Sequence, residues 1–395
     1  MKNPTDALRD LANRLSVVDV ESMVDDCTDR VLASDIVADR DSPAADVSAM
    51  DGYAIRLADL SRTEQIAVSG ESAPGAPPPE IHVDSVVRIF TGAIVPTDCD
   101  AVVKREETEE LDEAIRFLDV ARKVQNGENI RRAGENAAAG STVLKAGVRL
   151  TAAHRATMAN FGAFAADVYA PVRITLITTG DEVGQFDRES PQPWELRNSN
   201  QSSIKALLSR SRWIQSVDTL HARDNRDDLQ STVASALEKS DAVLLTGGVS
   251  MGDYDYVPDV VRSVGGEIVF HGLPVRPGKP ILGGATADGK LILGLPGNPV
   301  SATIGCHRFG LPLLAKKSGQ TDWLLPCPTV RLDNPGDKTI PLHWMRLVRL
   351  IRQGVAQPVL SQGSGDLVSL GQSTGYVELP PGQSGEGPWP YYIWP

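Results

Sequence analysis

The sequence has few cysteines, and none of them is placed in a known metal or redox motif. The chain of 395 residues contains four, Cys27, Cys99, Cys306 and Cys327, which are far apart and form no C-x-x-C pair. This spacing excludes a zinc knuckle and a dithiol redox pair. Isolated thiols are typical of a reducing compartment, so we expect reduced cysteines in a cytoplasmic protein.

Long apolar runs and an excess of positive charge are also missing. No stretch approaches the roughly 18 apolar residues of a membrane span, and the first residues, MKNPTDALRDL, lack the apolar core of a signal peptide. The formal net charge is −12, whereas a general nucleic-acid binder needs a basic surface. We therefore expect neither a membrane nor a nucleic acid as partner.

Several familiar catalytic motifs are absent. The sequence has neither a Walker A loop nor G-x-G-x-x-G, so an ordinary ATPase and a dinucleotide-binding enzyme lose their main support. There is no G-x-S-x-G nucleophile elbow, and the six histidines show no paired spacing suited to a metal. Serine-hydrolase chemistry and a histidine-based metal site are therefore disfavoured.

The residues that are present indicate a globular protein with several domains. The apolar fraction of 41% and the charged fraction of 23% are ordinary, but 395 residues exceed what one hydrophobic core usually serves. Apolar spacing over 5–15, behind a capping Thr5, predicts an amphipathic helix. Further helices are expected from about Val20 to Leu32 and over 150–162, the latter ending at Gly162.

The region between these helices, and the region after them, have different patterns. Short alternating segments and proline-rich turns predict a small β domain inserted between two parts of an elongated helical domain. Strands alternating with helices then predict a doubly wound, mainly parallel α/β domain, and short strands broken by proline predict a small C-terminal β domain. The expected boundaries are 1–45 and 137–172 for the helical domain, 46–136 for the inserted β domain, 173–322 for the α/β domain and 323–395 for the last domain.

Three strands of the predicted α/β domain run into glycine-rich loops. These loops are TTGDE (178–182), TGGVSMGDYD (246–255) and GLPGNPVSA (294–302). The carboxyl ends of parallel strands meet at one edge of a sheet, where ligands bind, and glycines let backbone N–H groups approach a phosphate. A fourth loop, VRPGKP (275–280), adds Arg276 and Lys279, and Asn298 before Pro299 is expected to cap a helix. The pattern predicts an anion site.

Carboxylates accompany these loops. They are Asp181, Glu182, Asp224, Asp253 and Asp255. Each alone is as readily a helix cap or a solvated charge as a functional group. Together they suggest a divalent cation, because Mg²⁺ bridges carboxylates to phosphate oxygens.

The order of these motifs resembles that of a known family. The segments are SAMDGYA (48–54), TGAIVP and DAVV (91–103), NIRRAGEN (129–136), TTGDE, TGGVSMGDYDY (246–256), RPGKP (276–280), GLPGNPVSA and QGSGDLVSL (362–370). They resemble the MoeA family of molybdopterin molybdotransferases, which includes the E domain of gephyrin. The resemblance covers nearly the whole chain.

The resemblance implies an activity and an assembly. Adenylylated molybdopterin would be hydrolysed with Mg²⁺ while molybdate enters the dithiolene, in the last step of molybdenum cofactor assembly. The chain would form a homodimer in which the β domain of one subunit completes the cleft of the other. The adenylyltransferase of the preceding step is a candidate partner.

The resemblance also assigns roles to residues. The implied catalytic acids are Asp51, Glu182, Asp224 and Asp255, with Asp224 and Asp255 nearest the metal; Asp51 is added by the resemblance alone. The implied cofactor-binding residues are Thr246, Gly247, Gly248, Ser250, Gly252, Arg276, Pro277, Gly278, Lys279, Pro296, Gly297, Asn298, Ser301 and, from the last domain, Ser364.

Three positions depart from the family pattern. Asn136 stands where the family usually has an acid, Gly272 where it usually has a lysine, and Arg276 replaces a second lysine while keeping its charge. Asn136 and Gly272 motivate an alternative, a divergent protein that binds or carries molybdopterin or the finished cofactor without catalysing insertion. A further alternative is a gephyrin-like interaction scaffold that uses residues 323–395.

Overall fold

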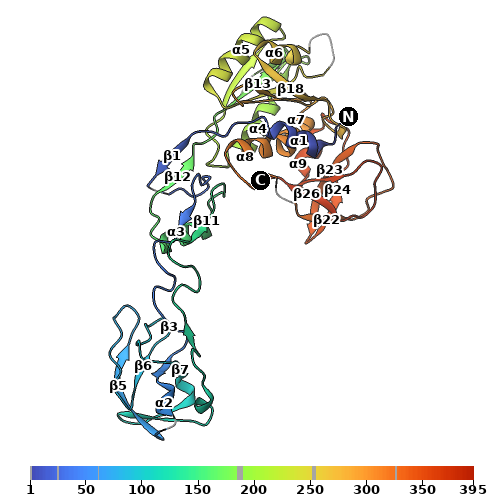
Figure 1. The fold of residues 1–395 in the computed structure, drawn as a ribbon. Coiled ribbons are helices and arrows are strands. Elements are labelled where there is room, and N and C mark those ends of the chain that lie inside the picture. Colours follow the sequence, from blue (N-terminus) through green and yellow to red (C-terminus); the bar gives the residue numbers. More distant parts are fainter. Residues whose placement is uncertain (1, 25, 61, 185–189, 251–254, 325–326) are drawn as a thin grey trace. The chain divides into compact units, whose positions relative to one another are not determined.

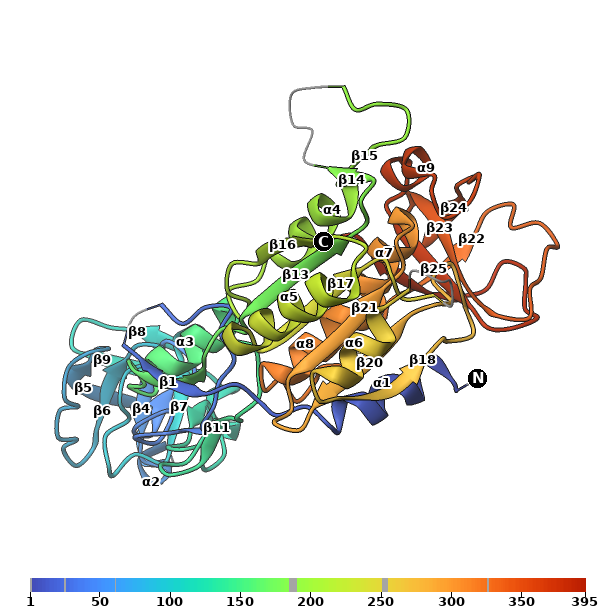
Figure 2. The same cartoon turned by 90° about the horizontal axis from the view of Figure 1, so that it is seen from above.

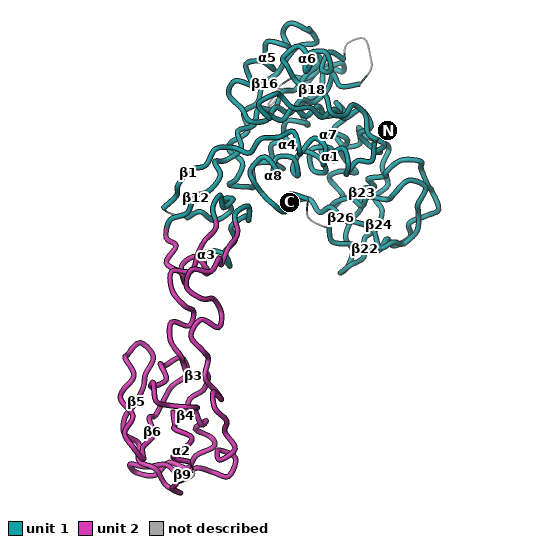
Figure 3. The backbone as a smooth tube through the Cα atoms, viewed as in Figure 1, with its two compact units in different colours: residues 1–34, 146–155, 165–395 teal, residues 35–145, 156–164 magenta. Residues whose placement is uncertain are grey.

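The computed structural model describes the chain except for residues 1, 25, 61, 185–189, 251–254 and 325–326 (Figure 1). It contains two compact units (Figure 3). Unit 1 comprises Met1–Ser34, Ala146–Arg155 and Ala165–Pro395, and unit 2 comprises Asp35–Lys145 and Ala156–Phe164. The finer division into five parts stays a prediction. Among the described residues, no helix is long and apolar enough to cross a membrane.

A six-stranded sheet forms the centre of unit 1. Its strands, in spatial order, are β16 (Asp218–Ala222), β13 (Ile174–Thr179), β17 (Ala242–Thr246), β21 (Leu291–Leu295), β20 (Leu282–Thr286) and β18 (Gly266–His271). The first four are parallel and the last two are antiparallel to their neighbours. Every residue of β13, β17 and β21 is buried, as expected for strands covered on both faces. The mainly parallel α/β prediction is confirmed.

Helices cover both faces of this sheet (Figure 2). On one face lie α5 (Arg226–Lys239) and α6 (Val257–Ser263). On the other lie α1 (Pro4–Ala12), α4 (Ser199–Leu208), α7 (Pro299–Gly305) and α8 (Leu311–Lys317). Side chains alternate between the two cores along each strand. In β17, Leu244 faces the side covered by α1, α4, α7 and α8, whereas Val243 and Leu245 face the side covered by α5 and α6.

The helix predicted over 5–15 forms, but its cap and its partner differ from the expectation. Asn3, rather than Thr5, caps α1 by accepting a hydrogen bond from the Thr5 N–H at 2.9 Å, and Pro4 occupies the first helical position. Leu8 and Leu11 are fully buried in the same core as the α/β sheet. This helix therefore packs as a layer against the α/β sheet.

The prediction of a helix from Val20 to Leu32 is wrong. Residues Val20–Met23 form strand β1, which pairs with β12 (Ala166–Tyr169). The following turn, with Asp29 at φ 65°, cannot continue a right-handed helix. Tertiary strand pairing thus overrides the local apolar spacing. Among the described residues of segments 1–45 and 137–172, the α-helices are α1 and α3 (Ala152–Asn160), and after α3 Gly162 has φ 69°, as suits a helix end.

Unit 2 contains the predicted β-rich region. Its sheet has the order β7 (Ala101–Lys104), β4 (Gly52–Ile55), β6 (Ser85–Ile89), β5 (Gln65–Ser72), β9 (Ala114–Phe117) and β8 (Thr108–Glu110). A short helix, α2 (Leu57–Leu60), follows β4. Two short pairs, β3 (Val47–Ser48) with β10 (Ile130–Arg131) and β2 (Ile36–Val37) with β11 (Thr142–Leu144), extend from it.

The C-terminal segment of unit 1 is a closed β structure. Its strands are β22 (Thr329–Leu332), β23 (His343–Arg352), β24 (Val355–Pro358), β25 (Gly375–Leu379) and β26 (Trp389–Ile393), with helix α9 (Leu367–Gln372). The order β23, β24, β22, β26, β25 closes through pairing of β25 with β23. The aromatic tail PWPYYIWP (388–395) supplies β26, which pairs with β22 and β25. A short strand from the α/β segment, β19 (Val275–Arg276), also pairs with β23.

A buried ionic network joins this β structure to the α/β segment. Arg308 lies in a π-helical turn, Cys306–Gly310, between α7 and α8, and its Nε donates to Glu378 Oε2 at 2.7 Å. The same carboxylate accepts from the Tyr392 hydroxyl at 3.0 Å and lies 3.1 Å from His343 Nδ1. Burial alone would raise the pKa of Glu378, but His343 and Arg308 lower this pKa to about 2.

We expect the substitution Arg308→Met to lower the free energy of unfolding at pH 7 by about 3–5 kcal/mol, because Glu378 would stay buried without its ionic partner. A folded-state pKa of about 2, below the ordinary 4.5, means that this carboxylate stabilises the fold above pH 4.5. That contribution is lost as the pH falls towards 2. Urea unfolding curves of wild type and variant should therefore converge in acid.

Arg331→Met is the matched control. Arg331 pairs with Glu386 at 3.8 Å, but both side chains are more than 60% exposed, so this variant should unfold almost like the wild type. Equal destabilisation by the two substitutions would contradict the assigned importance of the buried network.

Candidate functional site

The glycine-rich loops meet at the carboxyl edge of the sheet, as the sequence predicts. Strands β13, β17 and β21 are parallel neighbours, so the loops that follow them open on the same side. Together with the first turn of α4 they line a cleft of about 910 Å³. The predicted residues that line it are Glu182, Asp224, Thr246, Gly247, Gly248, Ser250, Asp255, Pro296, Gly297 and Asn298. Gly252, also predicted, lies outside the described residues.

Three of the four predicted catalytic acids line this one cleft. Asp224 and Asp181 follow neighbouring strands and are joined reciprocally: the Asp181 N–H donates to Asp224 Oδ2 at 3.3 Å, and the Asp224 N–H donates to Asp181 Oδ1 at 3.4 Å. Glu182 folds back against Gly180, where a Cβ would lie 2.5 Å from Glu182 Oε2. Asp255 lines the same cleft. The structure therefore groups these acids beside the glycine loops.

The fourth acid, Asp51, belongs to unit 2, whereas the other three belong to unit 1. Its Oδ1 accepts hydrogen bonds from the N–H and the hydroxyl of Thr91, both at 2.8 Å. These bonds lower the pKa of Asp51. The side chain is thus held as a carboxylate on the loop before β4.

Close backbone approach explains the glycines of the central loop. Gly247 has φ +95°, and a Cβ there would lie 2.4 Å from Thr179 Oγ1. Gly297 of the next loop approaches Gly247 directly, with its Cβ position 3.6 Å from the Gly247 Cα. A larger residue at Gly247 would require Thr179 to move, whereas at Gly297 a Cβ would make only an ordinary van der Waals contact. The glycines therefore set the shape of the cleft floor.

Two asparagines define the ends of helices at the cleft. Asn198 caps α4 by accepting from the Gln201 N–H at 3.0 Å. Asn200, which the sequence analysis missed, donates from Nδ2 to the Gly297 carbonyl at 2.7 Å and so links two loops. Asn298 is the N-cap residue of α7, with Pro299 at the start of the helix as predicted, although its side chain makes no capping hydrogen bond.

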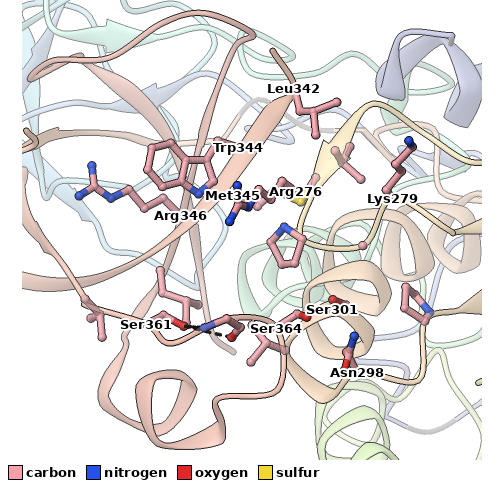
Figure 4. A pocket seen from close by; sticks show the side chains of 18 of the residues that line it. Arg276, Lys279, Asn298, Ser301, Leu342, Trp344, Met345, Arg346, Ser361 and Ser364 are labelled. Atoms are coloured by element: carbon pink, nitrogen blue, oxygen red, sulfur yellow. Dashed lines mark hydrogen bonds between the residues drawn. The ribbon is translucent and has the colours of Figure 1, made fainter. Parts of the chain in front are cut away.

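A second pocket of about 610 Å³ adjoins the cleft (Figure 4). The two share Pro280, Pro296 and Asn298. The other predicted residues line this pocket: Arg276, Pro277, Gly278, Lys279, Ser301 and Ser364. In Figure 4, Arg276 lies beside Trp344 and Met345, while Ser361, Ser364 and Ser301 lie together on the opposite side.

The charge of this pocket is opposite to that of the cleft, whose described lining contains four carboxylates (Glu182, Glu195, Asp224 and Asp255) and one cation, Arg197. Its lining contains four cationic side chains, Arg276, Lys279, Lys338 and Arg346, and no carboxylate among the residues that the structure describes. The Arg346 guanidinium lies over the Trp344 ring at 4.9 Å, and the Lys338 ammonium lies 5.8 Å from the same ring. An acid-lined cleft thus opens beside a cation-lined pocket.

The sequence analysis missed Lys338, Trp344 and Arg346. They come from the C-terminal β structure, and their place depends on the pairing of β19 with β23, which sets Arg276 opposite Trp344. The local sequence pattern does not predict a pairing between segments nearly 70 residues apart. Ser364, assigned by resemblance, is held there because its carbonyl accepts from the Val300 N–H at 3.0 Å.

The structure also describes the two positions that depart most from the family pattern. Asn136 Oδ1 accepts from Arg131 Nη2 at 2.9 Å, within unit 2. Gly272 has φ +83°, and its N–H donates to the Ile281 carbonyl at 2.8 Å. A lysine in this left-handed conformation would cost about 1–2 kcal/mol, so the local backbone here is suited to glycine.

Comparisons with known proteins agree with this architecture. Residues 3–162 match the MoeA N-terminal region (domain I and II), and residues 175–316 match a probable molybdopterin binding domain. The crystal structure of the molybdopterin biosynthesis MoeA protein from Pyrococcus horikoshii OT3 has a TM-score of 0.81, at 24% identity over 99% of both chains. The fold and these matches define the class, a multidomain protein built around an α/β domain of the molybdopterin-binding type.

Curated relatives narrow this class to a family. The molybdopterin molybdenumtransferase of Haemophilus influenzae is 34% identical over 76% of this chain and 73% of its own length. The protein of the same name from Bacillus subtilis is 32% identical over 92% of this chain and 86% of its own length. The chain belongs to the MoeA family.

We expect Gly247→Ala to destabilise the protein by about 2–4 kcal/mol, because it adds both a left-handed strain and a contact with Thr179. Gly354→Ala is the control, since Gly354 has φ +69° with open space around its Cβ position and should show only the strain of about 1 kcal/mol. Thermal unfolding compares the two. Equal losses would show that close packing does not constrain the loop.

Proposed function

We propose that this chain inserts molybdate into molybdopterin, with hydrolysis of the adenylylated form. The observation that carries the proposal is the acid-lined cleft beside a cation-lined pocket with shared walls. The reaction needs both, because it cleaves a phosphoanhydride and takes up an oxyanion. Both curated relatives are named molybdopterin molybdenumtransferases, which supports a transferase over the carrier alternative.

The cleft would hold the phosphoanhydride between molybdopterin and adenylate. The glycine loops after β17 and β21 let backbone N–H groups approach phosphate oxygens. Ser199 and Asn200, in the first turn of α4, line the same cleft, and N–H groups in a first turn lack intrahelical partners and favour an anion. These elements would orient the substrate with its scissile bond facing the acids.

The acids fit Mg²⁺ held jointly with a substrate. Among the described residues, no three acidic, histidine or cysteine side chains are grouped as a metal site. Mg²⁺ usually takes one or two carboxylates and completes its shell with phosphate oxygens and water. Asp224 and Asp255 would hold it, and when bound it would neutralise charge that develops on the phosphates.

Two further acids line the cleft: Glu195, which accepts from the Gln192 N–H at 2.8 Å, and Glu182, which would orient a water molecule towards the anhydride. Water adds to one phosphorus, the bridging P–O bond breaks, and molybdopterin and AMP leave as separate phosphates. Removal of a positioned charged group in such a site typically lowers the rate by about 10²–10³. Glu182 would thus act separately from Asp224 and Asp255, the pair proposed to hold the metal.

The pocket would bind molybdate. A tetrahedral dianion matches a guanidinium that can donate two parallel hydrogen bonds, which Arg276 provides; the Arg346 guanidinium instead donates to the Pro335 carbonyl at 2.6 Å and adds positive charge to the wall. The hydroxyls of Ser301 and Ser364 line the same pocket and can donate to further oxygens. Molybdate would therefore bind beside the cleft, next to the dithiolene of the molybdopterin that it enters.

We further propose a cytoplasmic homodimer in which Asp51 of the partner subunit completes the cleft. The family resemblance supports this arrangement. The preceding adenylyltransferase is proposed as a partner because its product is this enzyme's substrate.

The proposed activity predicts that the purified protein, given adenylylated molybdopterin, Mg²⁺ and molybdate, releases AMP and forms the cofactor. Asp224→Asn should lower AMP release by about 100-fold or more. Asp259→Asn is the control, because Asp259 is exposed in the first turn of α6 and pairs with Arg262. Wild-type protein that releases no AMP and forms no cofactor would contradict the proposal.

The dimer proposal predicts complementation between two inactive chains. Asp51→Asn and Asp224→Asn chains, coexpressed with different tags, should form mixed dimers with one intact cleft. Random pairing gives about half mixed dimers and hence about a quarter of wild-type AMP release. Mixed dimers purified by both tags that stay inactive would exclude a cleft shared between subunits.

A further inference from the structure

The cationic pocket lies at the interface between two segments of unit 1. One wall comes from residues 275–280 and 296–301 of the α/β segment, and the other comes from residues 338–364 of the C-terminal β structure. Two backbone contacts join these walls: the pairing of β19 with β23, and the hydrogen bond from the Val300 N–H to the Ser364 carbonyl. The distance between the walls therefore depends on what holds this interface.

Glu378 makes a third connection, by side chains, across the same interface. It lies on β25 opposite Met345 of β23, a residue that lines the pocket. One carboxylate oxygen accepts from Arg308 of the α/β segment, and the other lies 3.1 Å from His343 Nδ1. The carboxylate thus joins the two segments.

His343 transmits this connection to the pocket. It is the first residue of β23, and its N–H donates to the Pro274 carbonyl at 2.8 Å. The next pair in the register places Arg276 opposite Trp344. Because His343 directly precedes Trp344 in β23, its position sets the start of the strand pairing that carries Arg276 and Trp344.

The network is buried and closely packed, so its geometry is restricted. Glu378 and Arg308 are 8% and 5% exposed. The Tyr392 ring stacks on Tyr376 at 4.9 Å, and the Tyr376 hydroxyl lies 3.2 Å from His307 Nδ1. Buried ionic groups that have all their partners make a rigid arrangement, whereas one lost partner leaves an uncompensated charge.

We propose that Glu378 is a positioning residue for oxyanion binding. By holding Arg308 and His343 together, it sets the spacing between Arg276 and the β23 side chains of the cationic pocket. The inference rests on the proposed function of that pocket. It assigns Glu378 no contact with the substrate and no part in hydrolysis.

The test is calorimetric titration of the purified full chain with molybdate alone. Glu378→Gln should weaken molybdate binding by about tenfold, and Arg276→Ala, which removes a cation that lines the pocket, serves as the positive control. Tyr392→Phe removes a hydrogen bond from the same carboxylate but leaves Arg308 and His343 in place, so its affinity should stay within about twofold. Glu386→Gln, on the exposed surface pair, should bind like the wild type.

A second variant covers the case in which Glu378→Gln does not fold. His343→Leu leaves the pair of Arg308 and Glu378 intact and should also weaken molybdate binding about tenfold. AMP release at saturating molybdate should stay near the wild-type rate for both variants, because the acidic cleft is unchanged. Folded variants with wild-type affinity, or with losses matched by Tyr392→Phe, would overturn the positioning role.

Hydrogen exchange separates this inference from the proposed function. In Glu378→Gln, amides of residues 343–347 should exchange faster than in the wild type, with no change in the strands of the α/β sheet. If wild-type protein binds no molybdate, the proposed function of the pocket fails, while faster exchange still supports control of the interface by Glu378. Unchanged exchange would overturn that control.

Discussion

The parallel register of β13, β17 and β21 is the constraint on which the rest of the structure depends. Because the three strands run in the same direction and are neighbours, their following loops must open at one edge. Complete burial of these strands fixes that register, since a shift would move side chains between the two cores. The acids and glycines of three separate motifs become one site for this reason.

Charge separation is the second property of the site. Acids line the cleft and cations line the pocket, yet Pro280, Pro296 and Asn298 belong to both. The two regions share these three lining residues, but no charged side chain lines both of them among the described residues. The hydrolysis and the oxyanion binding proposed above would therefore use different charged groups.

The sequence predicted those features that depend on short, contiguous segments of the chain. The mainly parallel α/β sheet and the clustering of Glu182, Asp224 and Asp255 at its edge followed from pattern and from the rule about sheet edges. The failures have a common cause. The strand at Val20–Met23 and the pocket residues Trp344 and Arg346 depend on pairing between distant segments, which apolar spacing does not encode. Asp51 came from family resemblance alone.

Strand β19 has a consequence for how such a protein can change over evolutionary time. Its two residues belong to the α/β segment by sequence but to the C-terminal sheet by hydrogen bonding. A C-terminal domain exchanged with that of a relative would have to pair with a strand it does not encode. The two regions are therefore expected to be inherited together, as a single evolutionary module rather than two.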